Sequence, residues 1–250
     1  RDVRYREEAT LWRDGGPFRV QLFHPGSGFR VPVALHLVED GRIMPLAFDT
    51  TRFSYGDELG GRAVALAPQA GHAGFRILHP MNDTTRWDEV AVFLGASYYR
   101  LLGPQQIYGL SARGLAVGVA SPDGEEFPDF TAAWLVRPAP QGDDVLHFVT
   151  LLDGPSVTGA YRFALRPGTP EGRATVLEVR AQLFARQPMP RLGFAPLTSM
   201  YLHGTFRPGG RGGDDVRPRV HDSEGLLMQT AAGESIWRPL TNRRGVKVTS

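Results

Sequence analysis

The chain has 250 residues, no cysteine and a formal net charge of +2. The lack of cysteine excludes disulfides, thiolate metal sites and a cysteine nucleophile. The scattered arginines form no basic run that would follow nucleic-acid phosphates. The length suits one large β domain or two small ones, and no apolar stretch approaches the roughly 20 residues of a membrane span.

Short runs of alternating apolar and polar residues fill most of the chain, separated by 30 glycines and 20 prolines. Strands are predicted at residues 18–23, 31–38, 74–79, 90–94, 109–119, 132–136, 145–151, 159–165, 175–184, 199–202 and 225–229. Asp40-Gly41 predicts a hairpin turn. Residues 86–90 and 101–106 have room for a helical turn or two.

This pattern predicts an all-β fold, either a sandwich or a barrel, and argues against a doubly wound α/β fold. We see no internal repeat and no sharp domain boundary. Residues 207–215 are rich in glycine and are expected to form a surface loop, with a lid over a site as the alternative. The first residues do not resemble a signal peptide and read as the interior of a chain, so we expect a fragment of a longer protein.

Motifs of the common enzyme classes are missing. There is no nucleophile elbow, phosphate-binding loop, zinc-protease motif or dinucleotide fingerprint, and the seven histidines lack metal-ligand spacing. We therefore expect neither a metal nor a cofactor. Carboxylates close to aromatic residues remain, and that combination suits sugar chemistry.

Three segments have this composition. Residues 88–100 contain two acids, two tyrosines and an arginine around an apolar run, residues 124–130 place three acids beside phenylalanines and lead to Trp134, and residues 217–225 are followed by an aromatic segment at 234–240. Each has a purely structural alternative. Asp88 and Glu89 would pair with Arg86 or Arg100, the 125–126 pair would lie in a solvated turn, and Asp222 would cap backbone amides.

At these segments the sequence resembles the periplasmic osmoregulated glucan biosynthesis proteins of the G and D type. The matching stretches are Phe23-His24-Pro25-Gly26, Ala73-Gly74-Phe75-Arg76, residues 88–100, residues 108–115, Glu125-Glu126-Phe127-Pro128, residues 158–163, residues 195–200, Arg217-Pro218, His221-Asp222-Ser223 and Trp237-Arg238-Pro239-Leu240. The resemblance implies a large antiparallel β-sandwich similar to the galactose mutarotase-like fold. Residues 1–250 would be part of that domain, without the immunoglobulin-like C-terminal domain of the family.

The resemblance also implies an activity and a site. Family members act on β-1,2-glucan as inverting hydrolases or transglycosylases, and their general acid aligns with Asp222. The candidate base is Glu126, with Glu125 and Asp129 as substitutes. Arg219 departs from the family, which often has Glu there, and a positive charge would lower the pKa of a nearby Asp222.

The sequence therefore predicts a periplasmic protein that hydrolyses or transglycosylates β-1,2-glucan. The alternatives are a non-catalytic glucan-binding protein and a scaffold that contacts other glucan-synthesis proteins. The expected partner is a β-glucan, with no nucleic acid and no membrane span. The expected substrate-binding residues are Asp88, Tyr98, Tyr99, Arg100, Arg113, Trp134, His221, Trp237 and Arg238.

Overall fold

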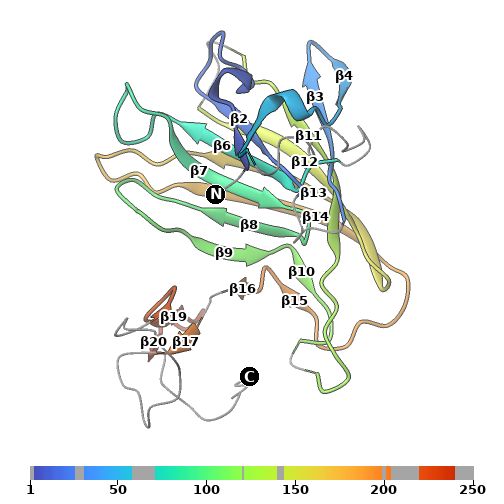
Figure 1. The fold of residues 1–250 in the computed structure, drawn as a ribbon. Helices are drawn as coiled ribbons and strands as arrows, with labels where there is room; N and C mark the ends of the chain where they lie inside the picture. Colours follow the sequence, from blue (N-terminus) through green and yellow to red (C-terminus); the bar gives the residue numbers. More distant parts are fainter. Residues whose placement is uncertain are drawn as a thin grey trace. The chain divides into compact units, whose positions relative to one another are not determined.

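The computed structural model describes residues 3–25, 31–57, 71–119, 121–139, 144–198, 201–203 and 220–239. The chain divides into two compact units, Arg1–Pro196 and Leu197–Ser250 (Figure 1). Strands make up nearly all of the regular structure in both units. Within the described residues, no helix is long and apolar enough to cross a membrane.

A six-stranded sheet forms one layer of the first unit, with the strand order β14-β13-β12-β11-β3-β4. Its strands are β3 (Ala34–Glu39), β4 (Arg42–Leu46), β11 (Asp129–Val136), β12 (Leu146–Asp153), β13 (Val157–Arg166) and β14 (Val176–Ala185). Neighbouring strands are antiparallel except β3 and β11, which run parallel. Side chains of β12 and β13 alternate between the core and the opposite face, whereas the edge strand β14 is mostly exposed.

A second sheet faces the first and is called here the β2–β9 sheet. Its antiparallel strands, in spatial order, are β2 (Arg19–Phe23), β6 (Gly74–His79), β7 (Asp88–Leu94), β8 (Tyr98–Leu101) and β9 (Leu110–Arg113). A register shift at residues 77–78 marks a bulge between β6 and β7.

Aromatic rings join the two layers. Phe93 on β7 lies 4.7 Å from Phe148 on β12, and Phe148 stacks on Phe163 at 4.8 Å between ring centroids. Phe75, Phe93, Phe148 and Phe163 are all at most 1% exposed. These contacts between facing sheets confirm the predicted all-β sandwich.

Shorter elements complete the two units. In the first unit, β1 (Val3–Tyr5) pairs with β5 (Phe53–Tyr55), and β10 (Leu115–Ala116) pairs with β15 (Gly193–Phe194). Two short 3-10 helices, η1 (Glu7–Ala9) and η2 (Thr50–Arg52), adjoin the β1–β5 pair. The second unit contains β16 (Leu197–Thr198), β17 (Tyr201–His203), β18 (Val220–His221), β19 (Gly225–Gln229) and β20 (Ser235–Pro239), with β17 paired to β18 and β19 to β20.

Most predicted strands coincide with observed ones, and the differences have local causes. Asp40 and Gly41 both have positive φ, 50° and 72°, so the predicted hairpin turn between β3 and β4 is confirmed. The helical turn expected at 86–90 is wrong, because β7 begins at Asp88 and pairs there with β6. The predicted loop at 207–215 lies outside the described residues.

His72 is the most deeply buried ionisable side chain beside this core, at 1% exposed. Burial lowers its pKa from 6.5 to about 4. The folded protein therefore binds fewer protons than the unfolded chain between these two values, and stability falls as the pH drops through that window. We expect this group to remove about 3 kcal/mol of unfolding free energy between pH 6.5 and pH 4.

Urea denaturation at pH 7, 5.5 and 4 measures this effect in the wild type and in His72→Leu. The leucine variant should lose less stability on acidification than the wild type. The matched control, His147→Gln at an exposed position on β12, should follow the wild type. Equal pH dependence in the wild type and His72→Leu would contradict the assignment.

Candidate functional site

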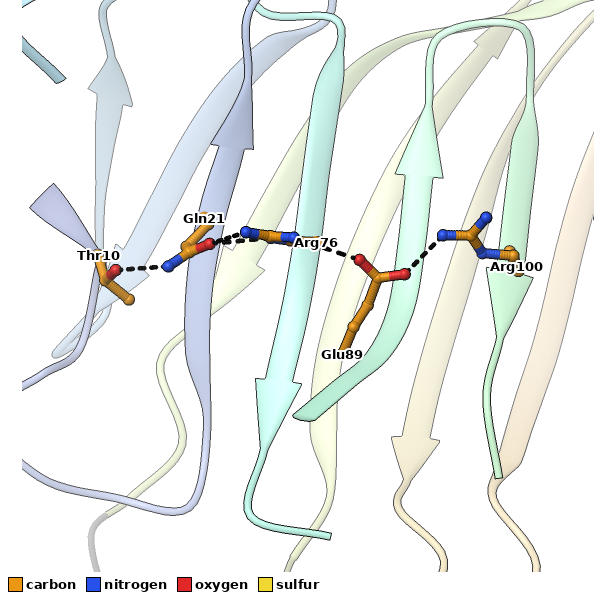
Figure 2. Close-up of polar contacts among 5 residues, drawn as sticks. All are labelled: Thr10, Gln21, Arg76, Glu89 and Arg100. Atoms are coloured by element: carbon orange, nitrogen blue, oxygen red, sulfur yellow. Dashed lines mark hydrogen bonds and ion pairs between the residues drawn. The ribbon is translucent and has the colours of Figure 1, made fainter. Parts of the chain in front are cut away.

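A row of polar side chains crosses the outward face of the β2–β9 sheet (Figure 2). Gln21 Nε2 donates to Thr10 Oγ1 at 2.9 Å, and Arg76 Nε donates to Gln21 Oε1 at 2.8 Å. Arg76 Nη1 lies 3.5 Å from Glu89 Oε2, and Arg100 Nη2 donates to Glu89 Oε1 at 2.6 Å. We call these five residues the polar row.

Strand register places three members of the polar row, Gln21, Arg76 and Arg100, in line, and Glu89 is opposite Leu78 just beyond the bulge. Gln21 is opposite Arg76, Arg76 is opposite Val92, and Val92 is opposite Arg100. Their sequence neighbours point the other way, into the core. Sequence analysis included only Arg100 among the site residues. The sequence predicted a pairing of Glu89 with Arg100 as a structural alternative, but it did not indicate that Thr10, Gln21 and Arg76 join them.

Two tyrosines, Tyr98 and Tyr108, extend this face from the polar row toward β9. Tyr98 and Ser111 hydroxyls share a hydrogen bond of 2.6 Å. The Arg100 guanidinium lies 5.3 Å from the ring centroid of Tyr108, which is 55% exposed. This face therefore combines guanidinium groups, a carboxylate and an accessible aromatic ring, the kinds of group that hold sugar hydroxyls and ring faces.

Two predicted binding residues of this segment, Tyr99 and Asp88, make structural contacts instead. Tyr99 is 8% exposed and stacks on Phe93 at 5.7 Å, so its ring belongs to the core. Asp88 accepts hydrogen bonds from Asn82 N at 2.9 Å and Asn82 Nδ2 at 3.0 Å, which closes the turn before β7. The predicted alternative that Glu89 pairs with Arg100 is confirmed.

A second group of residues lies near the end of β9 and the start of β11. It consists of Arg113, Phe127 and Asp129, and we call it the Arg113 corner. Arg113 Nη1 donates to Ala96 O at 2.7 Å, and its guanidinium lies 4.4 Å from the centroid of Phe127. Partial burial raises the pKa of Asp129, and the positive charge of Arg113 opposes part of that rise. No group in the described part of the chain donates a hydrogen bond to the Asp129 carboxylate.

Glu126, although only three residues away, has a different environment. One carboxylate oxygen accepts from Ser156 N at 3.0 Å and the other from Ser156 Oγ at 2.5 Å. Gln187 Nε2 in turn donates to Ser156 Oγ at 2.6 Å. Glu126 therefore fixes the turn between β12 and β13, whereas Glu125 beside it is exposed.

Trp134 lies on the other layer of the sandwich. Its neighbours Ala133 and Leu135 are fully buried, so the indole is on the outward face of the six-stranded sheet. There it stacks on His36, with 5.1 Å between centroids and 10° between planes. The structure therefore does not bring Trp134 together with the polar row.

The second unit contains the His-Asp-Ser turn. His221 is the last residue of β18, its side chain is 6% exposed, and its Nε2 lies 3.9 Å from Glu224 Oε2. Asp222 follows and is exposed. The predicted departure at Arg219 lies outside the described residues.

Trp237 and Arg238 lie on β20, opposite Leu227 and Leu226 on β19. Trp237 is 53% exposed. A Cβ atom at Gly225 would come within 2.7 Å of the indole, so the glycine leaves the space in which that ring lies. The second unit thus presents an exposed carboxylate and an exposed indole on neighbouring elements of one small unit.

The fold and these groups define an all-β sandwich protein with a face of arginines, acids and tyrosines. The whole chain, residues 1–250, matches the family described as "Periplasmic glucan biosynthesis protein, MdoG". The chain belongs to this family, as the sequence resemblance predicted.

Curated relatives named "Glucans biosynthesis protein G" agree with this result. The relative from Pseudomonas paraeruginosa is 42% identical over 99% of this chain and 46% of its own length. Those from Shewanella frigidimarina and Ralstonia nicotianae are 44% and 45% identical over 100% of this chain, and over 43% and 48% of their own lengths. The chain therefore spans just under half the length of these relatives.

Proposed function

We propose that this chain acts in the biosynthesis of periplasmic glucans by cleaving or transferring a β-1,2-linked glucan backbone with inversion at the anomeric carbon. The observation that carries the proposal is the Arg113 corner, where Asp129 has a raised pKa, no hydrogen-bond donor among the described residues, and an arginine stacked on an aromatic ring beside it. Membership of a family named for periplasmic glucan biosynthesis supports the substrate class.

The proposed reaction needs one acid and one base. Asp222 donates a proton to the glycosidic oxygen as the bond to the anomeric carbon breaks. Asp129 accepts a proton from a water molecule, or from the hydroxyl of an acceptor sugar, as that oxygen attacks the opposite face. The two carboxyl groups of inverting enzymes stand roughly 6.5–9.5 Å apart, and a wider separation requires hydroxyls or waters that relay the proton.

Asp129 is preferred to Glu126 as the base for a physical reason. Both oxygens of Glu126 are already engaged by Ser156, so a proton transfer there would break a structural link. Asp129 has no such link, and partial burial brings its pKa closer to the neutral range in which a base works best. Glu125 is the exposed alternative.

Binding of the glucan is assigned to accessible groups near these carboxylates in each unit. On the β2–β9 sheet, Tyr98, Tyr108 and Arg100 offer a ring face and hydroxyl partners. In the second unit, Trp237 and Arg238 offer the same kinds of contact. An exposed aromatic ring covers the apolar side of a pyranose, and arginine donates to its hydroxyl oxygens.

The direct test is incubation with linear β-1,2-glucan, followed by chain-length analysis and by NMR of the anomeric configuration in the first product. We expect the chain length to change and the first product to be the α anomer. No change in length would reject catalysis by this chain. A β anomer would reject inversion.

A non-catalytic glucan-binding role is the second candidate. Arg219 favours it, because this arginine stands where the family pattern often has an acidic residue, three positions before Asp222 in sequence. Calorimetry together with chain-length analysis separates the catalytic role from the binding role. A protein that only binds glucan gives a heat signal on titration but leaves the glucan chain length unchanged.

A further inference from the structure

A cavity of about 570 Å³ opens beside the β1–β5 pair. Its lining includes Arg6 and Glu8 from the start of the chain and Thr50, Arg52, Phe53 and Tyr55 from η2 and β5. Pockets that hold small ligands typically have volumes of roughly 300–1,000 Å³. This cavity is therefore large enough for a small molecule.

The two arginines of the lining are neighbours. Arg6 N donates to Arg52 O at 2.8 Å, and Arg6 Nε donates to Phe53 O at 3.0 Å, which fixes the Arg6 guanidinium at the end of the β1–β5 pair. Its one ion-pair partner in the described chain is Glu8, 3.7 Å away on the rim, whose side chain is 68% exposed. An exposed pair of this kind contributes little and is readily exchanged.

Arg52 makes no ion pair with a carboxylate of the described residues, although hydrogen bonds from Thr51 and, to a smaller extent, the Arg52 charge lower the pKa of Asp49. Arg52 Nε is buried without a hydrogen-bond partner, and no carboxylate of the described residues lies within 4.0 Å of its guanidinium. Asp49, the acid nearest in sequence, instead accepts from Thr51 N at 2.8 Å and Thr51 Oγ1 at 2.6 Å. The neighbouring Tyr5 phenol carries no charge of its own, because burial raises its pKa.

A second polar group of the lining is also unsatisfied. Tyr55 Oη is buried and has no hydrogen-bond partner within the described residues. Burial also raises the pKa of Tyr55, so this hydroxyl stays neutral and can donate. A buried donor without an acceptor costs free energy, and a ligand reaches this hydroxyl only by displacing the atoms that cover it.

We infer that this cavity binds the oxyanion group of a small molecule, either a carboxylate or a phosphate monoester. Arg52 and Arg6 would hold the charged oxygens, and Thr50 would donate from its hydroxyl. Arginine suits both anions because its planar fork matches two oxygens at once. Among the described residues of the lining, the two cations outnumber the one acid, which lies at the exposed rim.

This site is separate from the proposed glucan-processing carboxylate of the first unit. The β1 strand lies beside β2, which is the edge strand of the β2–β9 sheet. The Arg113 corner lies at β9, with β6, β7 and β8 between. At the usual spacing of strands the two edges are about 19 Å apart.

Isothermal titration calorimetry of the chain at pH 7 and constant ionic strength tests the inference. The probes are inorganic phosphate and acetate, with chloride maintaining the ionic strength and glucose as the neutral comparison. We expect saturable binding of at least one anion and none of glucose. Tighter binding of phosphate identifies a phosphate ester as the ligand class, and tighter binding of acetate identifies a carboxylate.

Variants locate the binding. Arg52→Gln should weaken anion binding by about ten-fold or more, the usual effect of losing a charge-assisted contact. Arg6→Gln should weaken it as well, and this residue is exposed enough to be replaced without unfolding the chain. The control Arg42→Gln, at an exposed position on β4, should bind like the wild type.

The inference is overturned if neither anion binds saturably, if glucose binds as well as they do, or if Arg6→Gln and Arg52→Gln both keep wild-type affinity. Should Arg52→Gln unfold, as thermal melting would show, Arg6→Gln decides alone. Glucan turnover is not a readout of this experiment, so its result is independent of the proposed activity.

Discussion

Replacing Asp222 with asparagine is expected to lower the rate of β-1,2-glucan cleavage or transfer by roughly 10²–10⁴-fold, the range of a general acid. The amide keeps the size of the side chain but has no proton to donate to the leaving oxygen. Because glucan contacts would remain, we expect the loss in kcat rather than in KM. Chain-length analysis with linear glucan measures the rate.

The matched control is Glu234→Gln, which removes an exposed carboxylate from the turn between β19 and β20 of the same unit. It should keep the wild-type rate. Thermal melting should show that Asp222→Asn is folded, since Asp222 is exposed. A rate equal to that of the wild type in Asp222→Asn would remove this residue from the reaction.

Asp129→Asn is expected to lower the same rate by roughly 10²–10⁴-fold, because the attacking oxygen loses its proton acceptor. Folding raises the pKa of Asp129 above 3.8, so in the wild type the charged form opposes folding as the pH rises through the folded pKa. Asparagine removes that effect. The variant should therefore be at least as stable at pH 7 as the wild type.

Glu126→Gln separates the structural carboxylate from the reacting one. It weakens the charge-assisted hydrogen bonds from Ser156 and is expected to cost about 1 kcal/mol of unfolding free energy. Its glucan rate should stay near that of the wild type while the protein is folded. Asp123→Asn, at an exposed position three residues earlier, is the control for both properties.

The pH profile supplies a second readout. If Asp129 is the base, the wild-type rate should fall on the acidic side as the pH drops through its raised pKa, and Asp129→Asn should lack that limb. The assignment fails if Glu126→Gln loses the rate and Asp129→Asn keeps it. In that case Glu126, and not Asp129, is the residue that accepts the proton.

The β-sandwich and the family could be predicted from the amino-acid sequence. Alternation with a period of two places Phe148 and Phe163 on one face of their strands, and Asp40-Gly41 favours the tight turn that joins β3 to β4. These signals are local, so they are readable without coordinates.

The candidate site needed the tertiary structure, because burial and strand register depend on residues far apart in the chain. Sequence spacing treats Glu126 and Asp129 alike, yet a serine 30 residues onward engages Glu126. No residue that the structure describes donates to Asp129. Likewise, Gln21, Arg76, Glu89 and Arg100 become neighbours only because four strands pair side by side, with a bulge between β6 and β7 just before Glu89. The alternating pattern of the sequence determined that this is a β protein, whereas strand pairing, which joins residues far apart in the chain, decided which of its polar groups contact one another.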